Sequence, residues 1–200
     1  MNMGELRQLF DSLESDDRPL SLRNEAMFKL LATTGMRKSE LVNLIWEQVD
    51  FYNETIRIYG KGKKERLLPL HSIVVPLLKK YKDSLENVQT HPTEPIFVNG
   101  NGKPLNPRGL NYIFKDVFER AGLPPHRFTL HHLRHTFATL LFAAIENRNE
   151  RCTCNAITKE KVDLKTLQEL LGHESLATTQ VYTHIDFDTK KRAIDSFQFE

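Results

Sequence analysis

The sequence predicts an α+β fold that is mainly α, a set of helices with one small three-stranded antiparallel sheet, in a single domain of 200 residues. A chain of this length can build one substantial core but not two. Several stretches repeat apolar residues at the helical period, and NPRGLNYIFKDVFERAG (106–122) does so most regularly. By contrast, TIRIY (55–59) and ERLLPL (65–70) flank a short turn, which predicts a β-hairpin.

Two helices are expected before the hairpin, after a polar and acidic lead-in over residues 1–18 that holds one short helix. The first of the two carries the apolar residues of AMFKLLATTG and ends at Gly35, a residue type suited to helix ends. The second, SELVNLIW (39–46), has Ser39 as its expected N-cap. Arg37 lies in the short junction between these two helices.

The sheet is expected to contain VDF (49–51) as a third strand, and the turn GKGK (60–63) gives the hairpin a basic tip. After the sheet, IVVPLLKKYKDSL (73–85) predicts a helix with Pro76 in its first turns. PIFVN (95–99) and the Asn-Gly pairs behind it predict a short strand and tight turns.

The second half of the chain is expected to be helical. The helix of residues 106–122 has Asn106 as N-cap, Pro107 at its first position and Gly122 as its stop. HHLRHTFATLLFAAI (131–145) follows with its own apolar stripe, and a polar interval, 146–162, is interpreted as an insertion. Residues 183–200 are assigned to a C-terminal tail. The remaining helices are expected in three segments: DLKTLQELLG, ATTQVYTH and DTKKRAIDSF.

Composition argues against a membrane protein and a secreted disulfide-rich protein. No apolar run approaches the roughly 18 residues that span a bilayer, and the N-terminus does not resemble a signal peptide. Cys152 and Cys154 form no disulfide framework, so a reducing compartment is expected. The net charge of +2 is small, but residues 57–82 hold eight Lys or Arg and one acid. That stretch is either a phosphate-binding surface or an ordinary solvated face.

HHLRH contains residues suited to binding an anion. His131 and Arg134 are three positions apart and therefore project on the same side of a helix. An arginine can fork onto two oxygens of a tetrahedral group, and a histidine can add a donor or move a proton. A structural histidine is the alternative for His131 taken alone. His132 and His135 are interpreted as packing or solvent-facing residues.

Metal chemistry is the rival reading of the same motif. His131 and His135 have the i, i+4 spacing of a helical zinc site, which Cys152 and Cys154 could complete. No Glu stands inside the motif as in metal-dependent hydrolases, and Cys-x-Cys is a weak zinc signal. Paired carboxylates for two metals are also missing, because the candidates are ordinary terminal residues: Asp16, Asp17, Asp186 and Asp188.

Four segments, in order, resemble the catalytic domain of the tyrosine recombinases, the family of the phage integrases and Xer-type bacterial recombinases. They are TTGMRKSELVNLIWEQVDF, GKGKKERLLPL, TLHHLRHTFATLL and LLGHESLATTQVYTH, and the resemblance runs from about residue 20 to about residue 188. It implies the DNA breaking-rejoining fold and site-specific DNA recombination or integration. Departures are Leu130, where the family often has Pro, His132, where Asp is common, and the 146–162 insertion.

The resemblance implies a set of catalytic residues. Arg37 and Arg134 would stabilise the charge of the transition state, with Glu40 at the acidic position of the R-x-x-E pattern, and Lys61 would protonate the leaving group. The family's remaining positions fall on His131, His173 and the nucleophile Tyr182, which would form a 3′-phosphotyrosyl link without ATP, metal or other cofactor. Basic hairpin residues are candidate DNA contacts: Lys63, Lys64 and Arg66.

The resemblance also implies partners. Double-stranded DNA is the expected substrate, and the 183–200 tail is expected to join protomers into a homo-tetramer on DNA, with a monomer in its absence. The upstream core-binding domain of longer members is expected to be absent. No membrane association is expected; the implied location is the cytoplasm, on the nucleoid, in a bacterium, archaeon, phage or mobile element. The alternatives are a type IB topoisomerase-like relaxing activity, a DNA-binding module without catalysis, or a metal-dependent phosphodiesterase.

Overall fold

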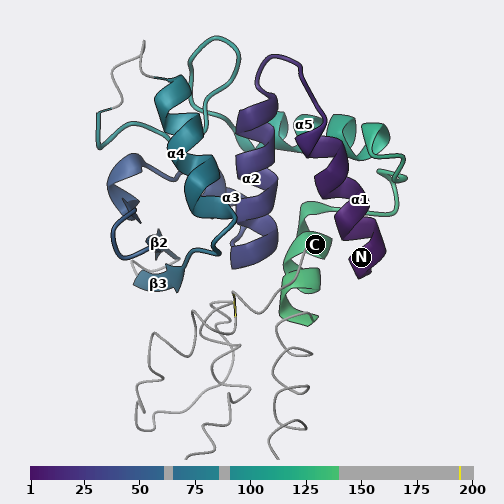
Figure 1. Ribbon diagram of the computed structural model, residues 1–200, viewed down its shortest axis with the longest axis horizontal. Coiled ribbons are helices and arrows are strands. Elements are labelled where there is room, and N and C mark those ends of the chain that lie inside the picture. The colour runs from purple at the N-terminus through teal and green to yellow at the C-terminus, as the bar shows by residue number, and fades with distance from the viewer. Residues whose placement is uncertain (61–64, 86–90, 140–193, 195–200) are drawn as a thin grey trace, which may run out of the picture.

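The computed structural model describes residues 1–60, 65–85, 91–139 and 194. It confirms the fold class, with helices arranged around a central helix and one small sheet at the side (Figure 1). Residues 130–139 form a further helix, called the 130–139 helix below. The other elements are α1 (Met3–Glu14), α2 (Ser21–Thr34), α3 (Lys38–Val42), η1 (Trp46–Gln48), β1 (Val49–Asp50), β2 (Thr55–Tyr59), β3 (Glu65–Pro69), α4 (Val74–Ser84) and α5 (Pro107–Arg120).

Helix α2 is the centre of the core and packs against α1 and α4. Its residues from Ala26 to Thr34 are all buried, so this stretch has no solvent-exposed face. The hydroxyls of Thr33 and Thr34 donate back to the helix carbonyls of Lys29 and Leu30, which satisfies them inside the core. As predicted, α2 ends at Gly35, whose φ is 59°.

Helix α1 makes the predicted lead-in part of the core. Asn2 caps it by accepting from the Glu5 N–H at 2.8 Å, and Glu5 reaches back to the Asn2 N–H at 2.8 Å. Its apolar stripe packs against α2 and α5. The buried members of the stripe are Leu6, Leu9, Phe10 and Leu13.

The three strands form the predicted antiparallel sheet, in the order β1-β2-β3. In the hairpin, Ile58 pairs with Arg66 and Tyr59 with Glu65, so Arg66 lies close to the end of the β2–β3 ladder that leads to the tip. The tip residues 61–64 lie outside the described residues.

The second predicted helix is wrong in its start and its length. Arg37, not Ser39, occupies the N-cap position of α3, because the Glu40 carboxylate reaches back to the Arg37 N–H. The helix ends at Val42, since the next residues pair with residues 94–96 instead of continuing it. The Ile96 N–H donates to the Leu44 carbonyl at 2.8 Å. The predicted strand PIFVN is also wrong, because its residues form only isolated bridges, Pro95 with Ile45 and Val98 with Pro104.

The second half agrees with the prediction as far as it is described. Asn106 caps α5 by accepting from the Gly109 N–H, Pro107 opens the helix, and Gly122 follows it with a φ of 66°. The helix predicted over 131–145 is present from 130 to 139. The insertion 146–162 and the first two of the later helices lie outside the described residues, and of the third only Ile194 is described. Ile194 of the tail is described and is fully buried in the core. No helix of the described part could cross a membrane.

Candidate active site

Two segments that are about a hundred residues apart in sequence meet at the C-terminal end of α2. A Cβ built on Gly35 would lie 2.4 Å from Cδ1 of Phe137, so the 130–139 helix can approach the chain this closely only at a glycine. Arg134, one turn before Phe137, donates from Nη1 to the Gly35 carbonyl at 2.6 Å. The contact therefore places Arg134 beside the junction between α2 and α3, which contains Arg37.

Arg37 is oriented by a buried carboxylate. Its backbone N–H donates to Oε2 of Glu40 at 2.7 Å, and its Nη1 donates to Oε1 at 3.1 Å. The Arg37 side chain remains 40% exposed, whereas the Glu40 side chain is 5% exposed. The junction between α2 and α3 thus places the Arg37 guanidinium at the surface, and the buried Glu40 carboxylate fixes its position.

Arg66 completes this arrangement from β3. Its two Nη groups donate to the two carboxylate oxygens of Glu40 at 2.9 and 2.7 Å, a bidentate pair, and its side chain is only 13% exposed. The structure therefore places Arg66 against Glu40 and not on an open surface, although the sequence suggested it as a DNA contact. A buried carboxylate needs cationic partners, but the burial of Glu40 is a result of the fold and no local pattern in the sequence shows it.

Within the described part of the chain, positive charges gather at this point. Burial, followed by repulsion from Arg37, lowers the pKa of Arg134 to about 10, and Glu40 opposes that shift. Burial alone would raise the pKa of Glu40, but hydrogen bonds from Arg66 and Arg37 outweigh it and hold the pKa below the ordinary value. Among the described residues, the Glu40 carboxylate lies among three guanidiniums, those of Arg37, Arg66 and Arg134. The arrangement therefore favours binding of a further anion.

His131 lies on the exposed side of the 130–139 helix, one turn from Arg134. Its ring meets that of His135 edge to face, with centroids 4.3 Å apart. Desolvation, together with the charges of His135, Arg134 and His132, lowers the pKa of His131. A neutral imidazole, which can accept a proton, is therefore favoured at neutral pH.

His132 has a structural role, in line with the sequence interpretation. Its Nδ1 accepts from the Thr129 N–H at 3.0 Å, which closes the start of the 130–139 helix. Its ring contacts Phe128 edge to face. This contact fixes the first turn, from which His131 projects.

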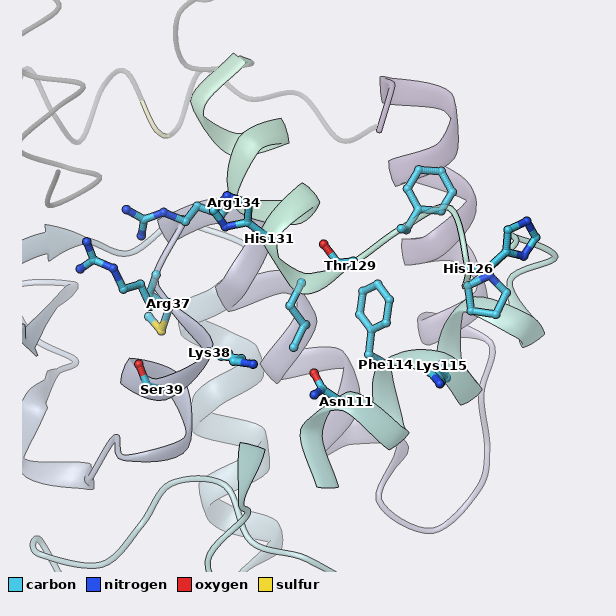
Figure 2. Close-up of a pocket in the computed structure, with 14 residues that line it drawn as sticks. Arg37, Lys38, Ser39, Asn111, Phe114, Lys115, His126, Thr129, His131 and Arg134 are labelled. Carbon is cyan, nitrogen blue, oxygen red and sulfur yellow. The ribbon is translucent and has the colours of Figure 1, made fainter. Parts of the chain in front are cut away.

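Arg37, His131 and Arg134 line a pocket of about 770 Å³. Figure 2 shows Arg37, His131 and Arg134 at one end, with Lys115 and His126 at the other. The residues at the far end come from α5 and the loop after it. Sequence reasoning did not identify this end of the pocket, and the available signal was the exposed polar residues on α5. The lining of the far end includes Asn111, Lys115, Pro125, His126 and Thr129.

The structure describes four of the predicted site residues, Arg37, Arg66, His131 and Arg134. Arg37, His131 and Arg134 are brought together at one end of the pocket. Apart from Arg66, the other predicted catalytic and DNA-contacting residues lie outside the described residues: Lys61, Lys63, Lys64, His173 and Tyr182. Cys152 and Cys154, the candidate partners of a zinc site, also lie outside. Within the described ranges, no group of three or more potential metal ligands occurs.

Replacing Glu40 by glutamine is expected to lower the free energy of unfolding by about 2 kcal/mol at pH 7, because Arg66 keeps its burial but loses its counter-charge. The lowered pKa of Glu40 means that its ionised form stabilises the fold above the ordinary carboxyl value of 4.5. That stabilisation is lost as the pH falls through the lower pKa of the folded state. Urea unfolding at pH 7 and pH 3 should show the difference between variant and wild type shrinking in acid.

Glu65→Gln is the matched control for this measurement. Glu65 pairs with Arg57 at 3.9 Å, and both side chains are more than half exposed. An exposed pair of this kind contributes about 0–1 kcal/mol. Equal losses for the two glutamine variants, or a Glu40→Gln loss that does not change with pH, would contradict the buried counter-ion role.

Comparison with known proteins gives one consistent family. A model described as the phage integrase family matches residues 1–147 and 151–189. The chain is 38% identical over 192 residues to tyrosine recombinase XerC of Anoxybacillus flavithermus, covering 92% of this chain and 57% of that protein. It is 36% identical over 185 residues to XerC of Bacillus subtilis, covering 90% and 55%.

Solved structures agree with the sequence matches. A XerH site-specific recombinase bound to its difH substrate in a pre-cleavage complex has a TM-score of 0.69 and 28% identity, over 98% of this chain and 50% of that one. A XerA recombinase has a TM-score of 0.70 and 30% identity, over 96% and 62%. The chain thus spans between half and two thirds of the length of these proteins.

Proposed function

Because the chain belongs to the phage integrase family, we propose that it is a site-specific tyrosine recombinase that cleaves and rejoins DNA through a covalent link to Tyr182. The observation that carries this proposal is the convergence of Arg37, His131 and Arg134 at one end of a pocket, with the buried Glu40 carboxylate beside the two arginines. Cationic side chains at that density suit a scissile phosphodiester, whose negative charge increases in the transition state.

The described residues of the site have different proposed roles in catalysis. Arg37 and Arg134 bind the non-bridging oxygens of the phosphate and stabilise the pentacoordinate transition state. The side chain of His131, held neutral by its lowered pKa, accepts the proton of the attacking hydroxyl. In this proposal the side chains supply the positive charge, so the chemistry requires neither metal nor ATP.

Three further roles are proposed from the family resemblance for residues outside the described ranges. The Tyr182 oxygen attacks phosphorus, the bond to the 5′-oxygen breaks, and Lys61 gives that oxygen its proton. His173 donates to a phosphate oxygen. The 3′-phosphotyrosyl bond stores the energy of the broken bond, so a 5′-hydroxyl of a partner strand can reverse the step.

The proposed partner is double-stranded DNA, which would be met in the cytoplasm, with four protomers assembled through the 183–200 tail. Docking of the tail on a neighbour would require Ile194 to leave the core of its own chain, where it is fully buried. The protein without DNA is therefore expected to be a monomer. Lys63 and Lys64 are proposed to contact the DNA backbone.

A suicide substrate tests the proposal. A pool of nicked duplexes with a random core should yield a covalent protein–DNA adduct, because the short strand beyond the nick diffuses away after cleavage. Tyr182→Phe is expected to abolish the adduct, since phenylalanine lacks the attacking oxygen. Gel electrophoresis in denaturant measures the adduct, and sequencing of the trapped DNA defines the target.

The outcomes separate the rival functions. An adduct that survives chelator and disappears in Tyr182→Phe supports the recombinase. Binding without any adduct would indicate a silent DNA-binding module, and chelator-sensitive cleavage would indicate a metal-dependent phosphodiesterase. A protein that forms the adduct and relaxes supercoiled DNA, but exchanges no strands between two duplexes carrying the recovered site, would be a topoisomerase.

A further inference from the structure

Arg66 is the least exposed arginine of the hairpin, and it joins two parts of the fold that are far apart in sequence. It lies on β3 opposite Ile58, while its guanidinium reaches Glu40 of α3, 26 residues away along the chain. The other arginine of the hairpin, Arg57 of β2, pairs with Leu67 in the next position of the ladder. Its side chain is 57% exposed and lies 3.9 Å from Glu65. The two arginines therefore lie on adjacent strands but differ in what they touch.

The Glu40 carboxylate receives four hydrogen bonds, which fixes both of its oxygens. Oε1 accepts from Nη1 of Arg66 at 2.9 Å and from Nη1 of Arg37 at 3.1 Å. Oε2 accepts from Nη2 of Arg66 at 2.7 Å and from the Arg37 N–H at 2.7 Å. Each oxygen thus has one bond to Arg66 and one to Arg37. Arg66 defines the plane of the carboxylate, and that plane defines where Arg37 can bond.

Arg66 and Arg37 differ in how far their side chains are exposed to solvent, which indicates different roles. The side chain of Arg66 is 13% exposed and that of Arg37 is 40% exposed, although both bind the same carboxylate. A lone Arg37 would have to satisfy a buried carboxylate with its whole fork and would turn inward. With Arg66 bonded to both oxygens, Arg37 gives the carboxylate one Nη and its backbone N–H. Its side chain, 40% exposed, lines the pocket.

We propose that Arg66 is a positioning residue, which holds the Glu40 carboxylate in the orientation that presents the Arg37 guanidinium to the scissile phosphate, without touching DNA itself. This inference rests on the proposed function, and it replaces the DNA contact that the sequence suggested for Arg66. The bidentate geometry, the burial of Arg66 and the shared carboxylate all lie within the described residues. The two strands of the hairpin carry the restraint to α3.

A first experiment needs no DNA. In Arg66→Met the Glu40 carboxylate loses two of its four donors, so the Arg37 amide is expected to exchange with deuterium about tenfold faster, a change of one decade in the local opening equilibrium. The Gly35 amide, which bonds the Leu31 carbonyl at 3.0 Å, serves as the internal reference. Arg57→Met is the matched control and should leave the Arg37 amide rate unchanged. An unchanged rate in Arg66→Met overturns the inference.

A second experiment uses the DNA recovered by the suicide-substrate selection, with either a normal phosphodiester or a neutral methylphosphonate at the cleaved bond. A methylphosphonate carries less charge for Arg37 to neutralise. The cleavage defect of Arg66→Met, expected to be about tenfold on the phosphodiester, should therefore shrink on the methylphosphonate, as that of Arg37→Ala should. A merely structural defect would be the same on both substrates, and would overturn the inference.

Binding and a conservative variant complete the test. If Arg66 contacted a phosphate directly, Arg66→Met would weaken DNA binding and reduce its salt dependence by about one unit of slope; this result would also overturn the inference. Arg66→Lys keeps the charge but not the fork, should fold even where methionine does not, and is expected to show a smaller defect of the same kind. Wild-type protein that forms no adduct would refute the proposed function, while the amide exchange would still decide the role of Arg66.

Discussion

Replacement of Arg134 by methionine is expected to slow DNA cleavage by about 10²–10³-fold, the loss typical of removing one donor to transition-state charge. The same replacement is expected to change the free energy of unfolding by no more than about 1 kcal/mol, because two contributions oppose each other. The hydrogen bond from Arg134 to the Gly35 carbonyl is lost. The cost of keeping a charge in a buried place among other guanidiniums is also removed.

The pKa of Arg134 identifies the second contribution. A base whose pKa is lowered to about 10 by burial and by Arg37 is still protonated at pH 7, but the folded state bears a cost for that charge. Methionine fills similar space without the charge. Adduct formation and urea unfolding, measured on one preparation, test the separation. A variant that loses cleavage only in proportion to lost stability would show that Arg134 serves the fold and not the reaction.

Much of the fold could be predicted because local patterns decided it. The α5 boundaries follow from Asn106, Pro107 and Gly122, whose conformational preferences act within one turn of helix. The β2–β3 hairpin follows from alternation within two short stretches. In both cases the residues that determine the element are inside it or next to it.

The errors arose where distant residues decide the structure. SELVNLIW has helical periodicity, but residues 44–46 pair with residues 94–96, and no local signal shows that contact. Ser39 is a favourable N-cap, yet the Glu40 carboxylate is held by Arg66 from the sheet and closes the helix start on Arg37 instead. Tertiary partners outweighed local preference at both places.

The candidate site shows the same division. The motif spacing predicted that His131 and Arg134 project together, and both line the pocket with Arg37. Sequence alone did not show that Gly35 is the contact point for Phe137, or that Arg66 supports Arg37 through Glu40. Those relations join segments whose separation in the chain exceeds any periodic pattern.

Substitution of Gly35 by alanine is expected to lower the free energy of unfolding by about 2–5 kcal/mol, the sum of two effects. Gly35 has a φ of 59°, where an L side chain costs about 1–2 kcal/mol. In addition, the new Cβ would lie 2.4 Å from Cδ1 of Phe137, a fully buried ring with little space to retreat. Overpacking of this kind costs about 1–3 kcal/mol.

Gly102→Ala separates the two effects. Gly102 has a φ of 72°, but nothing lies within 4 Å of a Cβ built there, so only the backbone cost applies. The difference between the two alanine variants in urea unfolding therefore measures the clash. Phe137→Leu combined with Gly35→Ala should recover part of the loss, and additive losses would show that the ring is not responsible. Because Arg134 bonds the Gly35 carbonyl, the alanine variant should also lose cleavage at temperatures where it is still folded.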